Sequence, residues 1–456
     1  MLVAPPVRSP VERVPEPDRA RRLEQVEDLL RSVIAGLEPE PGDIRRGVPG
    51  RPRVLPGLCL WAGLVVCVLR GFTSQLSVWR LVARIGLWFY PRALVTDQAV
   101  YDRLGAGGTA VLERLFTQLS ALLAERLAPY AETTLAPFAS EVVALDETTL
   151  DSVARVLPSL RAVPKGDARL LPGKLTGLFD LRRQQWRRIA HQADPRQNEK
   201  VAARTMLDGL PAGCLLLADL GYFGFSWFDE VTDRDVWWIS RLRSKTSYTV
   251  IHAFYDDGTT FDGLVWLGVH RADRAKHAVR LVRFRVGQTT FRYVTNVRDP
   301  RVLPIVEIAR LYARRWDIEL AFLLIKRHLN LHLLWSAKDV IVLQQVWAVL
   351  IIAQILQALR LEIAGRAGVP TFDVSLALLV QYLPHFAATG QDPVACFVER
   401  GRAAGFIRPS TRTRVQAPTI PEDRLIWPPP DLVLVRTPRY AQRKTGPRPT
   451  TTTAVA

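Results

Sequence analysis

Four side chains with complementary chemistry share one segment past the midpoint of the chain, LYARRWDIELAFLLIKRHL. They are Tyr312, Arg315, Glu319 and Lys326, at relative positions 0, +3, +7 and +14. At about 100° per residue, these offsets keep all four within one narrow stripe of a helix. A phenol, two cations and a carboxylate on one side of a helix could bind and cut a charged substrate.

The remainder of this predicted helix is apolar and is expected to face a core, which would aim the polar stripe into a cleft. The apolar residues at helical spacing are Trp316, Leu320, Leu323 and Leu324. The alternative is a surface helix with an Arg315–Glu319 ion pair. That pairing favours the acid on the N-terminal side, and the order here is reversed.

Two more acids follow apolar runs that are typical of buried strands. Asp146 ends the run in EVVALDETT, and Asp219 ends the run in AGCLLLADLGYFG. Together with Glu319, two acids at strand ends can converge above a sheet, where oxygen ligands suit Mg²⁺ or Mn²⁺. A pair of such ions activates a water or a 3′-hydroxyl and stabilises the leaving oxygen of a phosphodiester. The alternative for a single strand-end aspartate is a turn or a helix N-cap.

Composition and periodicity divide the chain into segments of different character. Strands that end in acids, with a helix between them at 194–210, predict an α/β core. Residues 182–184 are expected to form a turn between two of these strands. A run rich in β-branched and aromatic residues predicts antiparallel strands before helices return. The segments are 1–57 with one possible helix, helical 58–138, the first core part 139–234, a β-rich block 235–297, the second core part with helices 298–405, and a flexible basic tail 406–456.

The helical segment 58–138 contains two helix patterns separated by a turn region with Gly86 and Pro91. Thr96 or Asp97 could cap the second helix. Both a helix-turn-helix, which would bind DNA, and a plain helical pair fit this pattern.

The net charge of +17 favours a polyanionic partner, nucleic acid first and an anionic membrane second. The four scattered cysteines form no CxxC pair, which indicates neither a zinc site nor a disulfide framework and fits a reducing cytoplasm. The apolar run from Val340 to Leu361 contains four glutamines and is interpreted as a buried helix, so no membrane span is expected. No GxxxxGK loop occurs, so no nucleotide cofactor is expected.

Three of these regions together resemble the DDE transposases of bacterial insertion sequences. The regions are ALDETTL, ADLGYFG and the pattern Y-x2-R-x3-E-x6-K, over about 140–335. The last pattern is similar to the motif of the Tyr-Arg-Glu-Lys group. Glu147 departs from the small residue that often follows the first aspartate; it is either an extra ligand or points aside.

The resemblance implies an RNase H-like catalytic core, interrupted by a β-rich insertion, between helical N-terminal and C-terminal regions. Asp146, Asp219 and Glu319 would hold two divalent ions, and Tyr312, Arg315 and Lys326 would bind DNA phosphates. In the group, the enzyme nicks the transposon end, and the freed 3′-hydroxyl attacks DNA. Aromatic candidates for stacking on a flipped base are Trp237, Trp238 and Trp266, and arginines in 182–188 and 241–243 would follow the phosphate backbone.

The sequence therefore predicts a cytoplasmic, nucleoid-associated transposase that acts as a homodimer on double-stranded transposon-end and target DNA. One alternative is a catalytically idle DNA-binding repressor derived from such an enzyme. Another is a nuclease without end specificity. His328 and His332 are spaced for a metal, but no third ligand accompanies them.

Overall fold

The computed structural model describes residues 25–37, 54–150, 162, 173–192, 194, 198–269, 273–331, 333–336, 338–389, 391–412 and 416–440. The chain divides into two compact units, each built from three stretches of sequence. Unit 1 comprises Met1–Glu132, Glu147–Arg196 and Trp316–Arg412, and unit 2 comprises Thr133–Asp146, Gln197–Arg315 and Thr413–Ala456.

Unit 1 is mainly helical and contains one antiparallel hairpin, in which strands β2 and β3 pair across the turn Leu181–Gln184. The predicted turn at 182–184 is therefore confirmed. The predicted N-cap of α5 is also confirmed, because the side chain of Thr96 accepts a hydrogen bond from the Ala99 amide. The elements of unit 1 are α2 (Gln25–Ala35), α3 (Gly57–Leu69), α4 (Gln75–Trp79), η1 (Arg80–Ile85), α5 (Asp97–Ala106), α6 (Ala110–Arg126), η2 (Ala128–Tyr130), β2 (Lys174–Asp180), β3 (Gln185–Gln192), α11 (Trp316–Leu323), η5 (Leu324–His328), α12 (Asp339–Ala367), η6 (Thr371–Asp373), α13 (Leu376–Thr389) and α14 (Pro393–Arg400).

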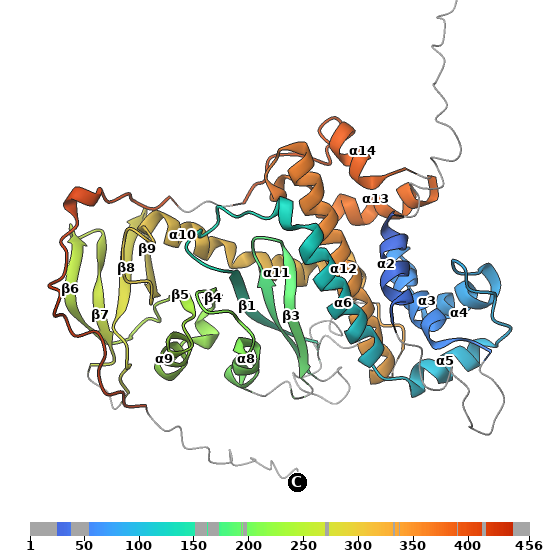
Figure 1. The fold of residues 1–456 in the computed structure, drawn as a ribbon, viewed down its shortest axis with the longest axis horizontal. Coiled ribbons are helices and arrows are strands. Elements are labelled where there is room, and N and C mark those ends of the chain that lie inside the picture. Colours follow the sequence, from blue (N-terminus) through green and yellow to red (C-terminus); the bar gives the residue numbers. More distant parts are fainter. Residues whose placement is uncertain are drawn as a thin grey trace, which may run out of the picture. The chain divides into compact units, whose positions relative to one another are not determined.

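The core of unit 1 surrounds α12, which packs against α3, α6 and β3 (Figure 1). Among the described residues, α12 alone is long and apolar enough to cross a membrane, and 83% of its most apolar window is buried inside the protein. Its four glutamines are buried, and two of them bond to neighbouring elements: Gln344 donates to the carbonyl oxygens of Leu104 and Gly107, and Gln354 accepts from the Trp186 amide at 2.8 Å. Such bonds satisfy backbone groups where helices and the hairpin meet.

Unit 2 is built on one mixed sheet. Strand β1 (Val142–Thr149) gives its first five residues to unit 2, and the strand order there is β1-β4-β5-β9-β8-β7-β6. The pairs β1–β4 and β4–β5 are parallel, and the rest are antiparallel. The further elements are α8 (Glu199–Leu207), β4 (Leu215–Ala218), η4 (Leu220–Tyr222), α9 (Phe225–Asp233), β5 (Trp237–Arg241), β6 (Tyr248–Asp256), β7 (Phe261–Leu267), β8 (Val279–Val286), β9 (Thr289–Thr295), α10 (Ile305–Arg314) and η7 (Glu422–Arg424).

Helices α9 and α10 cover opposite faces of this sheet. Trp238 of β5 stacks on Phe228 of α9, with ring centroids 4.1 Å apart. Tyr293 of β9 contacts Tyr312 of α10, with ring centroids 5.1 Å apart. Tyr293 pairs with Arg241 of β5, which is three residues from Trp238 and so points to the opposite face of the sheet. Because successive side chains of a strand alternate between faces, the two helices must lie on different sides.

A buried ion pair holds the loop that leads into α10. Arg280 of β8 and Asp262 of β7 are fully buried and form two hydrogen bonds of 2.6 Å. Arg280 also donates to the carbonyl oxygen of Leu303, just before α10. Bidentate geometry and a further acceptor are what a buried guanidinium needs to offset its desolvation.

The sequence predicted a flexible tail from residue 406, but residues 416–440 lie against the strands of unit 2. The Ile426 amide donates to the Phe254 carbonyl of β6, and the Ala278 amide donates to the Leu434 carbonyl. Figure 1 shows this segment in red beside β6 and β7. Its backbone and side chains complete hydrogen bonds that the sheet edge offers, which a net-charge pattern cannot reveal. Residues 441–456 lie outside the described part.

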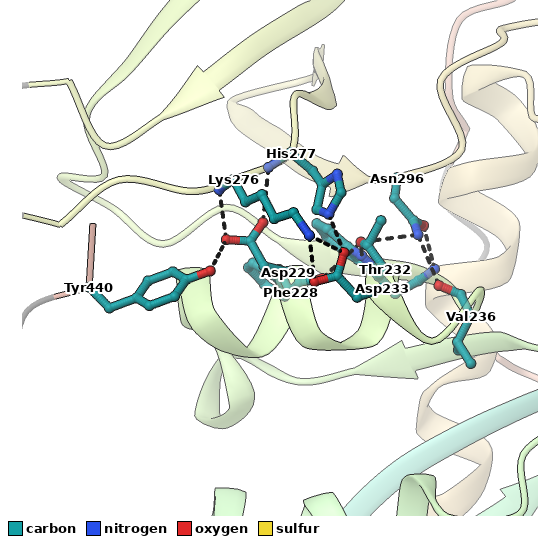
Figure 2. A network of polar contacts seen from close by, with 10 residues as sticks. Phe228, Asp229, Thr232, Asp233, Val236, Lys276, His277, Asn296 and Tyr440 are labelled. Carbon is teal, nitrogen blue, oxygen red and sulfur yellow. Dashed lines mark hydrogen bonds and ion pairs between the residues drawn. The ribbon is translucent and has the colours of Figure 1, made fainter. Parts of the chain in front are cut away.

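The segment ends at an acidic cluster on α9 (Figure 2). Asp229 accepts from the amides of Lys276 and His277 and, at 2.8 Å, from the Tyr440 hydroxyl. Asp233 accepts from the side chains of Lys276 and His277. Burial acts to raise the pKa of Asp233, but these hydrogen bonds lower it overall.

Two strand expectations need correction. Strand β1 runs three residues beyond Asp146 to Thr149, so Asp146 lies within the strand rather than at its end. The block 235–297 is not wholly antiparallel, because its first strand, β5, pairs in parallel with β4. The alternation of side chains in β5 is the same for either direction, so the sequence pattern could not decide this.

Candidate active site

Asp146 and Asp219 directly follow two residues that are register partners in neighbouring parallel strands. Leu145 of β1 pairs with Ala218 of β4; Asp146 is the next residue of β1, and Asp219 follows the last residue of β4. The preceding residues of both strands are fully buried or nearly so, and burial decreases at each aspartate. Both aspartates therefore lie where the buried residues of this parallel strand pair end.

The carboxylate of Asp219 accepts no hydrogen bond from any described residue, although the short helix η4 begins immediately after it. The N-cap alternative is therefore wrong for Asp219. In Asp146, Oδ2 lies 3.4 Å from Nη1 of Arg315, and the side chain is 19% exposed. Two partly exposed carboxylates with oxygen atoms facing a common edge are donors that fit Mg²⁺ or Mn²⁺.

The loop that follows Asp219 is held from two sides. Lys200 at the start of α8 donates to the Phe223 carbonyl at 2.9 Å, and Arg243 donates to the Leu220 carbonyl at 2.9 Å. The carboxylate of Glu199 lies close to Gly221, so a larger residue at position 221 would require the Glu199 side chain to move. Glu199 and Lys200 were not recognised in the sequence; the signal was the Asn198 cap that begins α8 beside this loop.

Tyr312 is 7% exposed, and its hydroxyl has no hydrogen-bond partner among the described residues. Burial raises the pKa of Tyr312, with a further increase from the charge of Asp219 and decreases from Arg315 and Arg241. The phenol is thus neutral and retains an unused donor close to Asp219. An unsatisfied buried hydroxyl is costly and is most simply explained by a ligand.

Arg315 is 4% exposed and pairs with Asp146, which excludes its interpretation as a surface ion-pair residue. The sequence predicted one regular helix for the segment that carries Arg315, and this prediction is wrong. Helix α10 ends at Arg314, α11 begins at Trp316, and Leu324–His328 form the π-helix η5. The constant 100° step therefore fails before Lys326.

Glu319 and Lys326 belong to unit 1, on α11 and η5, and both are partly exposed. The predicted apolar face was wrong at Trp316, which is 55% exposed, and at Leu320 and Leu323, which are only partly buried, and right at Leu324. The buried residues of α11 are Asp317, Ile318, Ala321 and Phe322. Among the described residues, no three His, Cys, Asp or Glu side chains form a close metal-binding group, and convergence of Glu319 on the aspartates stays a prediction.

Asp317, two residues before Glu319, is a buried acid that the sequence analysis did not single out. Its carboxylate accepts from Nη2 of Arg412 at 2.6 Å and from Nε2 of Gln184 at 2.9 Å. Arg412 and Arg360 also lie over the ring of Phe372, at 3.9 and 4.6 Å. These contacts fix the first turn of α11 within unit 1.

The predicted aromatic candidates have different environments. Trp237 is 36% exposed, Trp238 is buried against Phe228, and Trp266 lies under the guanidinium of Arg436 at 4.5 Å. Only Trp237 presents a large exposed surface of the three. Glu147 points to Lys174, with which it forms an ion pair of 2.7 Å.

The arginines in 182–188, the cysteines and the histidine pair are the remaining candidates from the sequence. Of the arginines in 182–188, Arg183 pairs with Asp180 at 2.9 Å, whereas Arg187 and Arg188 are exposed. Burial raises the pKa of Cys59 to about 11 and that of Cys67 to about 12, which fits buried, unreactive thiols. His332 lies outside the described residues, so the histidine pair is not tested.

Comparison with known proteins identifies a family that part of the chain matches. Residues 164–355 match the sequence model of the family described as "Transposase DDE domain". That range contains Asp219, Tyr312, Arg315, Glu319 and Lys326 and begins after Asp146. The resemblance to DDE transposases is therefore confirmed for this part of the chain.

A protein of Sinorhizobium fredii named "Putative transposase y4zB" is 26% identical over 170 residues. The match covers 36% of this chain and 47% of that protein, which is about half of its length. The cryo-EM structure of the piggyBac transposase synaptic complex with hairpin DNA matches over 86% of this chain and 84% of that chain, at 8% identity and a TM-score of 0.32. A likeness this weak supports no conclusion about the fold.

Proposed function

Because residues 164–355 carry a transposase DDE domain, we propose that the chain is a DDE transposase of the Tyr-Arg-Glu-Lys group. It cuts DNA at the ends of an insertion sequence and joins the freed 3′-hydroxyl to another phosphodiester. Its partners are double-stranded end and target DNA, it acts as a homodimer on DNA, and it works in the cytoplasm at the nucleoid. The observation that carries the proposal is the side-by-side placement of Asp146 and Asp219 where two parallel strands emerge from the core.

The strand arrangement supports an RNase H-like core for this activity. In unit 1, β3, β2 and the last residues of β1 follow one another, with β2 and β3 antiparallel. In unit 2, β1, β4 and β5 are parallel neighbours, and β6–β9 form the insertion. Acids at the carboxyl ends of such parallel strands are placed where ligands of α/β sheets bind.

In the proposed reaction, Asp146, Asp219 and Glu319 hold two Mg²⁺ or Mn²⁺ ions. The ions supply the activation of the attacking oxygen and the stabilisation of the leaving oxygen. Arg315, which pairs with Asp146, binds a DNA phosphate, and Tyr312 donates its unused hydroxyl to a phosphate oxygen. Lys326 adds a point charge that attracts the phosphate.

The test uses full-length protein, a duplex with the DNA that flanks the gene, a scrambled duplex and Mg²⁺. Nicked and joined products specific for the flanking DNA are expected. Asp219→Asn and Glu319→Gln should each lower the nicking rate by more than about 100-fold while DNA binding remains. Asp235→Asn is the matched control, since Asp235 is an exposed acid with a positive φ of 56° that asparagine also adopts.

Each alternative predicts another result. Binding of flanking DNA without nicking, with either Mg²⁺ or Mn²⁺, would identify a repressor. Cutting of both duplexes at equal rates without joined products would identify a nuclease without end specificity. Full activity of Asp219→Asn would remove the proposed metal site.

A further inference from the structure

A short loop of unit 1 exposes an unusual set of large apolar side chains. The loop comprises residues 85–95, between η1 and α5, and is called here the Phe89 loop. Ile85 is 61% exposed, Phe89 62% and Leu94 88%. Scattered exposed apolar residues are ordinary, but three within ten residues indicate a binding surface.

The backbone of the Phe89 loop is fixed by hydrogen bonds. The Ala93 amide donates to the Val82 carbonyl, and Nε1 of Trp79 donates to the Val95 carbonyl at 2.9 Å. Nε1 of Trp88 donates to the carboxylate of Glu27 at 2.8 Å. The loop therefore holds its exposed side chains in place without burying them, which lowers the entropic cost of binding a partner.

The charge around the Phe89 loop identifies the kind of partner. Arg80, Arg84 and Arg92 are exposed, and none forms an ion pair with a described residue. No aspartate or glutamate occurs in the sequence between Asp43 and Asp97. Glu27, the acid that Trp88 contacts, is already paired with Arg70. A cationic surface with apolar tips fits a polyanion that also offers apolar faces, which is what stacked base pairs between phosphates provide.

We propose that the Phe89 loop is a wedge that enters the minor groove of duplex DNA and bends it. Arg84 and Arg92 bind phosphates on either side, and Phe89 and Leu94 insert against a base step. Insertion of apolar side chains at a base step kinks a duplex by about 20–90°. The proposal rests on the proposed DNA-processing function but assigns a separate element, distant in sequence from the carboxylates.

The test measures affinity and bending with full-length protein and a mixed-sequence duplex that carries a fluorophore at each end. Phe89→Ser/Leu94→Ser should weaken binding about tenfold and abolish the change in energy transfer, with an unchanged salt dependence. Arg84→Ala/Arg92→Ala should lower the slope of log K against log salt by about 0.9 for each phosphate that the variant no longer neutralises. Val433→Ser, at an equally exposed valine, is the control and should change neither quantity.

Wild-type binding and bending by Phe89→Ser/Leu94→Ser would overturn the proposal. The proposal would also be overturned if this variant bound DNA as wild type does but no longer sedimented with phosphatidylserine vesicles, because the loop would then bind a membrane. The same holds if the variant bound DNA normally but no longer self-associated, because the loop would then bind a second copy of the chain. The single variant Leu94→Ser, at an 88% exposed site, repeats the test if the double variant unfolds. Wild-type protein that bends DNA but nicks none with Mg²⁺ would contradict the proposed function and leave the wedge intact.

Discussion

Asp146 and Asp219 are separated by more than seventy residues in the sequence but follow directly on Leu145 and Ala218, which are partners in a parallel strand pair. The buried apolar residues of both strands favour this register, because a shift by one residue would draw one of the carboxylates into the buried part of the sheet. The same packing that stabilises the sheet therefore places the two carboxylates side by side. Conservative changes in either strand that alter its register should affect activity through the carboxylates.

Tyr312→Phe is expected to change stability and activity in opposite directions. Loss of a buried hydroxyl without a partner among the described residues should raise the free energy of unfolding by about 1 kcal/mol. Nicking should fall, because the donor to the phosphate is lost. Urea denaturation and a nicking assay measure the two effects. A loss of both stability and activity would show that the hydroxyl has a structural role.

The same tyrosine predicts a dependence of stability on alkaline pH. Burial raises the pKa of Tyr312 above that of an exposed tyrosine, which is about 10. The contribution of the buried, protonated Tyr312 to the free energy of unfolding is fully present below pH 10. It is lost as pH rises further, since the unfolded chain then releases a proton that the folded chain retains. Between pH 10 and 11, Tyr312→Phe should lose stability less steeply than wild type, by up to about 1.4 kcal/mol per pH unit. Parallel curves would contradict the assigned burial.

Gln354 and Gln357 of α12 provide a matched pair of buried glutamines. Gln354 bonds with both backbone groups of Trp186 and with the Ser120 hydroxyl, whereas Oε1 of Gln357 has no partner among the described residues. Gln354→Leu should cost roughly 2–3 kcal/mol, because the Trp186 amide is left unsatisfied. Gln357→Leu should be neutral or stabilising. Thermal and urea unfolding of the two variants test this, and equal effects would refute the assigned contacts.

Tyr440→Phe is expected to loosen the C-terminal segment from α9. Its hydroxyl donates to the buried carboxylate of Asp229, and a bond to a charged group contributes about 1.5–3 kcal/mol. Limited proteolysis should therefore cut residues 416–440 faster. Tyr255→Phe is the control, because Tyr255 donates to Asp257 at an exposed site and should cost little. Unchanged proteolysis of Tyr440→Phe would show that the backbone bonds suffice.

Arg412→Leu should destabilise the fold by about 3–5 kcal/mol, because the carboxylate of Asp317, with 0% of its side chain exposed, loses its charged partner. Replacing both residues by leucine should recover much of this energy. Arg408→Leu, at an exposed arginine nearby, is the control. Denaturation of the three variants measures the effect. A double variant as unstable as Arg412→Leu would contradict the pairing.

The sequence predicted the strands that carry Asp146 and Asp219, because each is an unbroken apolar run that ends in an acid. It could not predict where β1 ends, since Glu147 and the threonines after it are compatible with either strand or loop. The prediction that one regular helix carries Tyr312 to Lys326 was wrong. Two α-helices and a π-helix follow one another there, and the spacing of apolar residues does not indicate a π-helix.

Contacts between residues far apart in sequence account for the other differences. Trp316 was predicted to be buried, and Asp317 was not considered. In the structure Trp316 is exposed, whereas Asp317 is buried and bonded to Arg412 and Gln184. The segment 416–440 was interpreted from its charge and prolines alone. Its position depends on open carbonyl and amide groups of strands more than a hundred residues earlier, which no local pattern reveals.

The docking of residues 416–440 on β6 and on the segment just before β8 has a consequence for biosynthesis. Both regions leave the ribosome well before the segment that completes them is translated. Because translation adds about 5–20 residues per second, the edge of the sheet stays uncovered for several seconds or more before residues 416–440 are synthesised. A nascent chain stalled in that interval would present an uncovered edge to chaperones, to proteases or to another copy of itself.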